Sequence, residues 1–271
     1  MQVYRGLDIG TAKPSVADRA AVRHHLIDVA APDEDWSAAR TQQLARAAVA
    51  DIEARGHRAL LVGGTGLYVQ AVVDDLRFPG EDLTLRADLE ASTRDPGGVA
   101  AAYATLAERD PVAAARIDPH NVRRIVRALE VITLTGRPFS SFGPGLQEPG
   151  PTVFPVHMVG VWLPRARLAE RIAARVDTMR HAGLVDEVAR LRDHPGLGRS
   201  AARGIGYQEI DEALAAGSDV APAAFDAITR HTRSFARRQR MWFRRDPRIA
   251  WVGTTDNPCA LLPALLAAWA S

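Results

Sequence analysis

Residues 57–73 read HRALLVGGTGLYVQAVV, and this stretch decides the fold class. Residues 57–62 end in a short apolar run that predicts a buried strand, and the glycine turn 63–66 follows directly. Helices are predicted before the strand, over 37–55, and after the turn, over 67–73. Helix, strand, glycine turn and helix in this order indicate a parallel α/β sheet, in which ligands lie at the carboxyl ends of the strands.

The segments that follow divide into an insertion and the rest of a core. Helices are predicted over 84–94, 98–108 and 119–135, and the Pro/Gly-rich stretch GRPFSSFGPGLQEPGP (136–151) comes after them. Strands return at 153–163 and 249–253, with a long helix from 165 between them, and an Ala/Leu-rich helix lies near the C-terminus. The apolar face of the long helix is predicted to hold Leu168, Ile172, Val176 and Met179. We therefore predict an α/β core of residues 1–79 and 151–271 with a helical insertion domain of residues 80–150.

The composition is typical of a globular cytoplasmic protein. Of the 271 residues, 47% are hydrophobic and 24% charged, and a single cysteine excludes an internal disulfide. The sequence lacks a Cys/His spacing typical of metal sites, and its apolar runs fall short of the ~20 residues that a membrane helix needs. The N-terminal residues lack the features of a signal peptide. We expect a cytoplasmic location and no membrane partner.

Positive charge is carried almost entirely by arginine. Lys13 is the only lysine, and the pI is about 9.0. Clustered arginines are the usual electrostatic footprint of nucleic-acid binding, because the planar guanidinium suits phosphate. A GC-rich coding style would produce the same bias, so the positions of the arginines matter more than their number.

Arginines occupy a helical face in the predicted helix 119–135. Arg123 and Arg127 lie one turn apart beside Arg124, and two arginines at that spacing can bridge adjacent phosphates of an RNA backbone. The alternative is a solvated helix face on which Glu130 pairs with an arginine.

Two later helices carry arginines in the same way. Arg167, Arg171 and Arg175 are four residues apart on one side of the helix 165–182, which is either a plain surface or a place where a leaving group's charge develops. The segment 229–248 interleaves arginines with aromatic residues, which suits contact with nucleic-acid backbone, although a solvated basic helix has the same pattern. Its arginines at near-helical spacing are Arg233, Arg237, Arg240 and Arg244.

Polar and glycine-bearing loops complete the candidate sites. MQVYRGLDIGTAKP (1–14) is a polar loop of the kind that lines a site, and RGIGYQEI (203–210) is a bent loop that enters a helix near Tyr207. Tyr207 either stacks on an unpaired base or packs in the core. The adjacent histidines of HHLID (24–28) point to opposite sides of an extended segment, so we assign no metal to them.

Together these motifs resemble the bacterial tRNA dimethylallyltransferases, the IPP transferase family. The resemblance covers essentially the whole chain and rests on motifs in the family's order. They are the N-terminal loop, HHLID, GGTGLY (63–68), RxxRALEV (124–131), RIxxRVxxM (171–179), RGIGYQE (203–209) and RRQxxWFR (237–244). It implies a P-loop-kinase-like core with a helical insertion, which transfers a dimethylallyl group from dimethylallyl diphosphate to the N6 amine of the adenosine immediately 3′ of the anticodon in tRNA.

The resemblance also implies roles for individual residues. Arg175 is expected to stabilise the diphosphate leaving group, with Thr11, Lys13 and Arg171 on the diphosphate side or in support. The residues expected to bind tRNA are Met1, Gln2, Thr65, Arg86, Arg123, Arg124, Arg127, Arg203, Gly204, Gly206, Tyr207, Gln208, Arg237 and Arg238. Mg²⁺ is the expected cofactor, with no metal ligand from this chain, and a monomer is the expected state.

The family pattern also extends upstream of Met1. Its segment usually reads Asp-Ser-Met-Gln-Val-Tyr and follows a strand, a Walker-type phosphate loop and a helix. We therefore expect that the natural protein is longer, and that the first strand, the phosphate loop and the general-base aspartate precede Met1. Two alternatives stay open: a tRNA-binding but inactive protein, and an enzyme that prenylates free adenine nucleotide.

Overall fold

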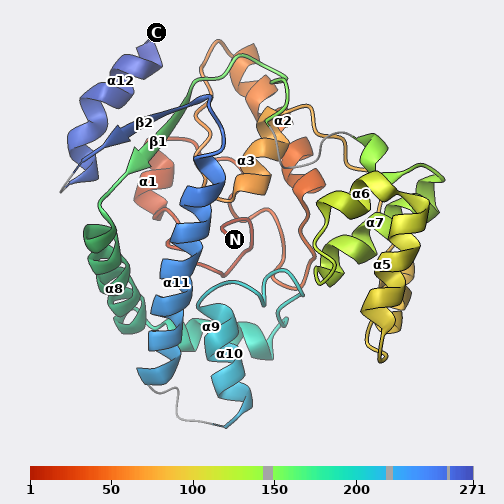
Figure 1. The fold of residues 1–271 in the computed structure, drawn as a ribbon. Coiled ribbons are helices and arrows are strands. Elements are labelled where there is room, and N and C mark those ends of the chain that lie inside the picture. Colours follow the sequence, from red (N-terminus) through yellow and green to blue (C-terminus); the bar gives the residue numbers. More distant parts are fainter. Residues whose placement is uncertain (143–148, 218–221, 255–256, 271) are drawn as a thin grey trace. The chain divides into compact units, whose positions relative to one another are not determined.

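The computed structural model describes residues 1–142, 149–217, 222–254 and 257–270, which form a mixed α/β protein rich in helices (Figure 1). The chain divides into two compact units. The larger combines residues 1–73 and 154–271, and the smaller consists of residues 74–153. Within the described residues, no helix is long and apolar enough to cross a membrane.

The larger unit contains a small parallel sheet and most of the helices. Strand β1 (Met158–Trp162) pairs in parallel with β2 (Ile249–Gly253), and Met158 lies opposite Ile249. The helices are α1 (Val16–Ala21), α2 (Ala38–Ala54), α3 (Gly66–Val73), α8 (Arg165–His181), α9 (Leu184–Asp193), α10 (Tyr207–Ala215), α11 (Pro222–Phe243) and α12 (Leu262–Ala270), with the 3-10 turn η2 (Pro258–Leu261). The long helices α8 and α11 pack against each other below the sheet in Figure 1.

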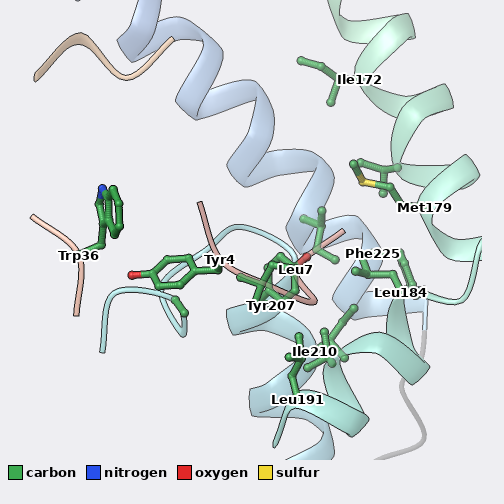
Figure 2. Packing of buried hydrophobic residues seen from close by; sticks show 14 of the residues in the cluster. Tyr4, Leu7, Trp36, Ile172, Met179, Leu184, Leu191, Tyr207, Ile210 and Phe225 are labelled. Carbon is green, nitrogen blue, oxygen red and sulfur yellow. The ribbon is translucent and has the colours of Figure 1, made fainter. Parts of the chain in front are cut away.

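The core of the larger unit joins the N-terminal loop to these helices. Figure 2 shows Tyr4 and Leu7 of the loop among Tyr207 and Ile210 of α10, Leu184 and Leu191 of α9, and residues of α8 and α11. The apolar face predicted for α8 is confirmed, because Ile172, Val176 and Met179 are buried and Leu168 packs against the same cluster. The N-terminal loop is therefore held by the core.

The smaller unit is helical. It consists of α4 (Leu83–Ser92), α5 (Gly98–Arg109), α6 (Pro111–Arg116), α7 (Val122–Thr135) and the 3-10 turn η1 (Phe139–Phe142). Helix α7 lies at its centre: Asn121 caps its start, Gly136 ends it in the left-handed conformation, and seven of its residues are buried. Residues 143–148 of the Pro/Gly-rich stretch lie outside the described residues.

One predicted strand is wrong. Residues 57–62 belong to no helix or strand, and the structure gives them no strand pairing. Leu60, Leu61 and Val62 are 71%, 44% and 82% exposed, so these side chains are not buried in a sheet. An apolar run becomes a strand only where a neighbour completes its hydrogen bonds, and within the described residues β1 and β2 pair only with each other. The prediction for 249–253 is confirmed residue by residue.

Candidate functional site

The N-terminal loop is fixed by one buried carboxylate. Glu187 Oε2 accepts hydrogen bonds from the backbone N–H groups of Asp8 (3.1 Å) and Ile9 (2.8 Å), and its Oε1 accepts one from Gly10 (3.3 Å). Tyr207 Oη donates to the same Oε1 at 2.6 Å. Burial and this bond to Glu187 raise the pKa of Tyr207 above its usual value. The loop and the RGIGYQE motif therefore share one anchor.

Lys13 lies in an ion-pair cluster that joins the N-terminal loop to Asp28. Its Nζ donates to Asp28 Oδ1 at 2.6 Å, to Asp8 Oδ1 at 2.5 Å and to the Tyr4 carbonyl oxygen at 2.8 Å, and its side chain is 3% exposed. Burial alone would raise the pKa of Asp28, but hydrogen bonds from Lys13 and Arg19 outweigh it and hold that pKa below the usual value. In this structure the positive charge of Lys13 is therefore neutralised by Asp8 and Asp28.

Two other loop residues also bond to the loop backbone. Thr11 Oγ1 donates to the Leu7 carbonyl oxygen at 2.7 Å, and Gln2 Nε2 donates to the carbonyl oxygens of Thr11 and Ala12, both at 3.1 Å. Met1 comes close to the second motif, since a Cβ on Gly204 would lie 2.8 Å from its Cε atom. The loop is thus a folded, internally bonded element.

The motif 203–209 is divided between surface and core. Arg203 and Gln208 are exposed, while Gly204, Gly206 and Tyr207 are buried. Gly206 has φ +98°, which only glycine adopts readily, and its N–H donates to Glu209 Oε2 at 2.6 Å. The ring of Tyr207 is 1% exposed and packs in the core, which is the second of the two alternatives that the sequence offered.

The glycine turn 63–66 is in contact with helix α11. Gln239 Nε2 donates to the Gly64 carbonyl oxygen at 2.8 Å. A Cβ on Gly64 would overlap the Gln239 amide, and one on Gly66 would overlap the Trp242 indole. Thr65, between the two glycines, is exposed. The structure therefore brings together the turn and the last arginine-rich motif.

Arginines on α8 and α11 lie at the surface of the larger unit. Arg171 and Arg175 are exposed on α8, beside its buried residues, and Arg237 and Arg238 are exposed on α11. These side chains are placed where they can meet a charged ligand without unfolding the core.

The arginines of the smaller unit are divided between internal and exposed positions. Glu130 is 0% exposed, and its Oε2 forms ion pairs with Arg86 Nε at 3.0 Å and with Arg127 NH1 at 2.9 Å. Burial would raise the pKa of Glu130, but hydrogen bonds from both guanidinium groups lower it. Arg127 also donates to the carbonyl oxygens of Pro79 (2.7 Å) and Gly80 (3.2 Å).

Arg123 is exposed on α7 and Arg124 is half-buried. Of the two alternatives for this helix, pairing with Glu130 therefore holds for Arg127 in this structure, whereas Arg123 is exposed to solvent.

Comparison with known proteins identifies the family to which the chain belongs. The sequence model for IPP transferase matches residues 2–246. The chain belongs to the IPP transferase family. The tRNA dimethylallyltransferase of Bifidobacterium animalis subsp. lactis (strain AD011) is 48% identical over 265 residues, which is 98% of this chain and 73% of that protein. The one from Salinispora tropica is 53% identical over 259 residues, or 95% of this chain and 79% of that protein.

Solved structures of the family have the same fold. The full-length tRNA isopentenylpyrophosphate transferase from Bacillus halodurans matches with a TM-score of 0.67 at 36% identity, covering 98% of this chain and 85% of that one. A eukaryotic dimethylallyltransferase, crystallised acting on tRNA, matches with a TM-score of 0.78 at 25% identity, covering 99% of this chain and 69% of that one.

Glu187 is not among the functional residues predicted from the sequence, although it holds the N-terminal loop. The sequence does contain a sign of this role, because Glu187 is an acidic residue on the apolar face of a helix. Its neighbours on that face, Leu184, Val188 and Leu191, are all buried. A carboxylate at such a position requires hydrogen-bond partners from elsewhere in the fold.

Proposed function

We propose that this chain transfers a dimethylallyl group from dimethylallyl diphosphate to the N6 amine of the adenosine immediately 3′ of the anticodon in tRNA. The observation that carries this proposal is family membership over residues 2–246, together with relatives about half identical in sequence that are named tRNA dimethylallyltransferases. We also propose a P-loop-kinase-like core for the larger unit, a monomeric state and a cytoplasmic location, as the resemblance to the family implies.

The arginines are proposed to work at two places. Exposed Arg175 stabilises the diphosphate as negative charge develops on it, with Arg171 one turn away on α8. Exposed Arg123, Arg203 and Arg237 contact the phosphate backbone of tRNA, since guanidinium groups suit phosphate oxygens.

Other residues of the family pattern hold these surfaces in place. Lys13, Arg86 and Arg127 act in this proposal through the ion pairs that fix the N-terminal loop and the start of α4. Thr65 is exposed at the glycine turn and so is available to tRNA.

Mg²⁺ is proposed as the cofactor, and no protein ligands are assigned to it. The described residues contain no group of three His, Cys, Asp or Glu side chains that could hold a metal ion. Asp8 and Asp28, the carboxylates nearest Lys13, are used in its ion pairs.

The test is transfer of labelled dimethylallyl groups by the complete gene product, with Mg²⁺ in the buffer. We expect label in unmodified tRNA, and digestion with mass spectrometry should place it on the adenosine beside the anticodon. Label in free adenosine monophosphate but not in tRNA would instead support an adenine-nucleotide transferase. Tight tRNA binding without transfer would support an RNA-binding protein.

Arg175 provides the residue-level test. Arg175→Gln is expected to lower kcat by about 100-fold, the usual effect of removing one group that stabilises developing charge, with little change in tRNA affinity. Because Arg175 is exposed, the fold should survive. Arg165→Gln removes an exposed arginine from the same helix and should change kcat less than about twofold. Equal losses in both variants would contradict the role of Arg175.

A further inference from the structure

Helix α11 has two faces of different character. Arg230, Arg233 and Arg237 lie along one side and are exposed, and Arg244, directly after the end of the helix, is exposed as well. At 3.6 residues per turn, Ile228, Gln239 and Trp242 fall on the opposite side, where Ile228 is buried and the other two are half-buried. Gln239 and Trp242 therefore face the protein while the arginines face outward.

The inward side contacts the backbone of the glycine turn directly. Gln239 Nε2 donates to the Gly64 carbonyl oxygen at 2.8 Å. The indole of Trp242 occupies the space that a side chain at Gly66 would fill, as the Gln239 amide does at Gly64. The two side chains thus cover the glycines on either side of Thr65.

Thr65 is fixed from the other direction by helix α3. Its carbonyl oxygen accepts the N–H groups of Tyr68 at 2.9 Å and Val69 at 3.1 Å, so it lies at the start of the helix. Its side chain is nevertheless exposed. An exposed hydroxyl is thereby held on a backbone whose position depends on α11.

We propose that Gln239 and Trp242 are positioning residues, which hold Thr65 in a fixed place relative to the arginine side of α11. A tRNA seated on those arginines then meets the Thr65 hydroxyl without rearrangement of the turn. This inference rests on the proposed function and deepens it, because it assigns to the inward side of the helix a part in orienting the tRNA substrate. A misplacement of the order of 1 Å at such a position is enough to lower a rate by about 100-fold.

The first test separates positioning from RNA binding. Gln239→Glu keeps the size of the side chain, removes the donor and places a carboxylate oxygen against the Gly64 carbonyl. In the complete gene product we expect kcat for transfer to tRNA to fall about tenfold or more, while the Kd for tRNA changes less than about twofold. Arg237→Gln, on the outward side, should instead raise the Kd and leave kcat at saturating tRNA nearly unchanged. A Gln239→Glu variant that weakens tRNA binding as much as Arg237→Gln would overturn the proposal.

A double-mutant cycle then tests whether Gln239 acts through Thr65. Thr65→Val removes the hydroxyl at constant volume. If Gln239 serves only to place that hydroxyl, adding Gln239→Glu to Thr65→Val should lower kcat by less than about twofold, because coupled residues are not additive. A further tenfold loss in the double variant would show independent effects and overturn the proposal, as would an unchanged kcat in Gln239→Glu alone.

Two further variants keep the outcome interpretable. Gln239→Asn retains the amide but is one methylene too short for Gly64, so it should reproduce the loss of kcat even if the glutamate variant does not fold. Gln43→Glu makes the same charge change at an exposed position of α2 and should leave kcat unchanged. A wild-type protein without transfer activity would overturn the proposed function and this inference together, whereas additive losses in an active protein overturn this inference alone.

Discussion

Among the residues that the structure describes, Tyr4 is buried with its hydroxyl poorly satisfied. Its ring is 1% exposed and meets Trp36 edge to face, with ring centroids 6.5 Å apart. Within the described part of the chain, its hydroxyl oxygen is the buried side-chain polar atom that has no hydrogen bond of normal geometry, although the Ser200 side chain lies close enough to lower its pKa slightly. Burial raises the pKa of Tyr4 to about 12, so the hydroxyl stays protonated at neutral pH. The ring is therefore the part of this side chain that stabilises the fold.

A substitution at Tyr4 tests this reasoning. Tyr4→Phe removes an unsatisfied buried polar group, so the free energy of unfolding should stay equal or rise by up to about 1 kcal/mol. Tyr207→Phe removes a buried hydroxyl that donates to Glu187 at 2.6 Å, and it should lower that free energy by about 1.5–3 kcal/mol. Urea unfolding of the two variants measures both values. Similar losses in the two would mean that the Tyr4 hydroxyl has a partner in solution.

At the scale of elements, helix α9 connects two motifs that are far apart in the sequence. Its buried Glu187 binds the backbone of the N-terminal loop and the hydroxyl of Tyr207. Gly10 must approach closely there, because a Cβ on it would lie 2.6–2.9 Å from the Tyr207 ring. The loop conformation is thus imposed by hydrogen bonds to a helix that lies 177 to 179 residues further along the sequence.

Replacing the carboxylate should release the loop. Glu187→Gln puts an amide NH₂ where the carboxylate accepted hydrogen bonds, so at least one donor loses its partner. We expect the free energy of unfolding to fall by about 2–3 kcal/mol, as measured by urea denaturation. Asp193→Asn makes the same charge change at the exposed end of α9 and should stay within about 0.5 kcal/mol of wild type. Protease cleavage within residues 5–14 should also become faster in Glu187→Gln alone.

The elements with strong local signals were predictable, and those that depend on distant partners were not. The helical spacing of α2 and the apolar face of α8 follow from residues within one segment. The run 57–62 has the composition of a strand, but strand formation requires a neighbour, which composition cannot supply. Likewise the arginines of α11 were predictable as a surface, whereas the contact of Gln239 with Gly64 joins residues 175 positions apart.

At the scale of the whole molecule, both units contain carboxylates that depend on their partners. In the larger unit, Asp28 is bound by Lys13 and Arg19. In the smaller unit, Glu130 is bound by Arg86 and Arg127. The assignment of the two units to a catalytic core and an insertion domain stays a prediction, but each unit has its own buried or half-buried ionic cluster.

These clusters predict acid sensitivity. The pKa values of Asp28 and Glu130 lie below their usual values, because hydrogen bonds from the basic partners outweigh the effect of burial. A carboxylate with a lowered pKa binds fewer protons in the folded state than in the unfolded state. Its stabilisation is complete above the unfolded-state pKa of about 4 and is lost as the pH falls through the lower, folded-state pKa.

We therefore expect the Tm of the protein to fall steeply as the pH is lowered from about 5 to about 3. Asp28→Asn should start from a lower Tm, because Lys13 and Arg19 lose an ionic partner. It should lose less Tm over the same pH range, because asparagine does not titrate. Scanning calorimetry of both proteins at several pH values measures the two slopes. Parallel slopes would show that Asp28 titrates alike in the folded and unfolded states, and that the Lys13 cluster contributes nothing to acid stability.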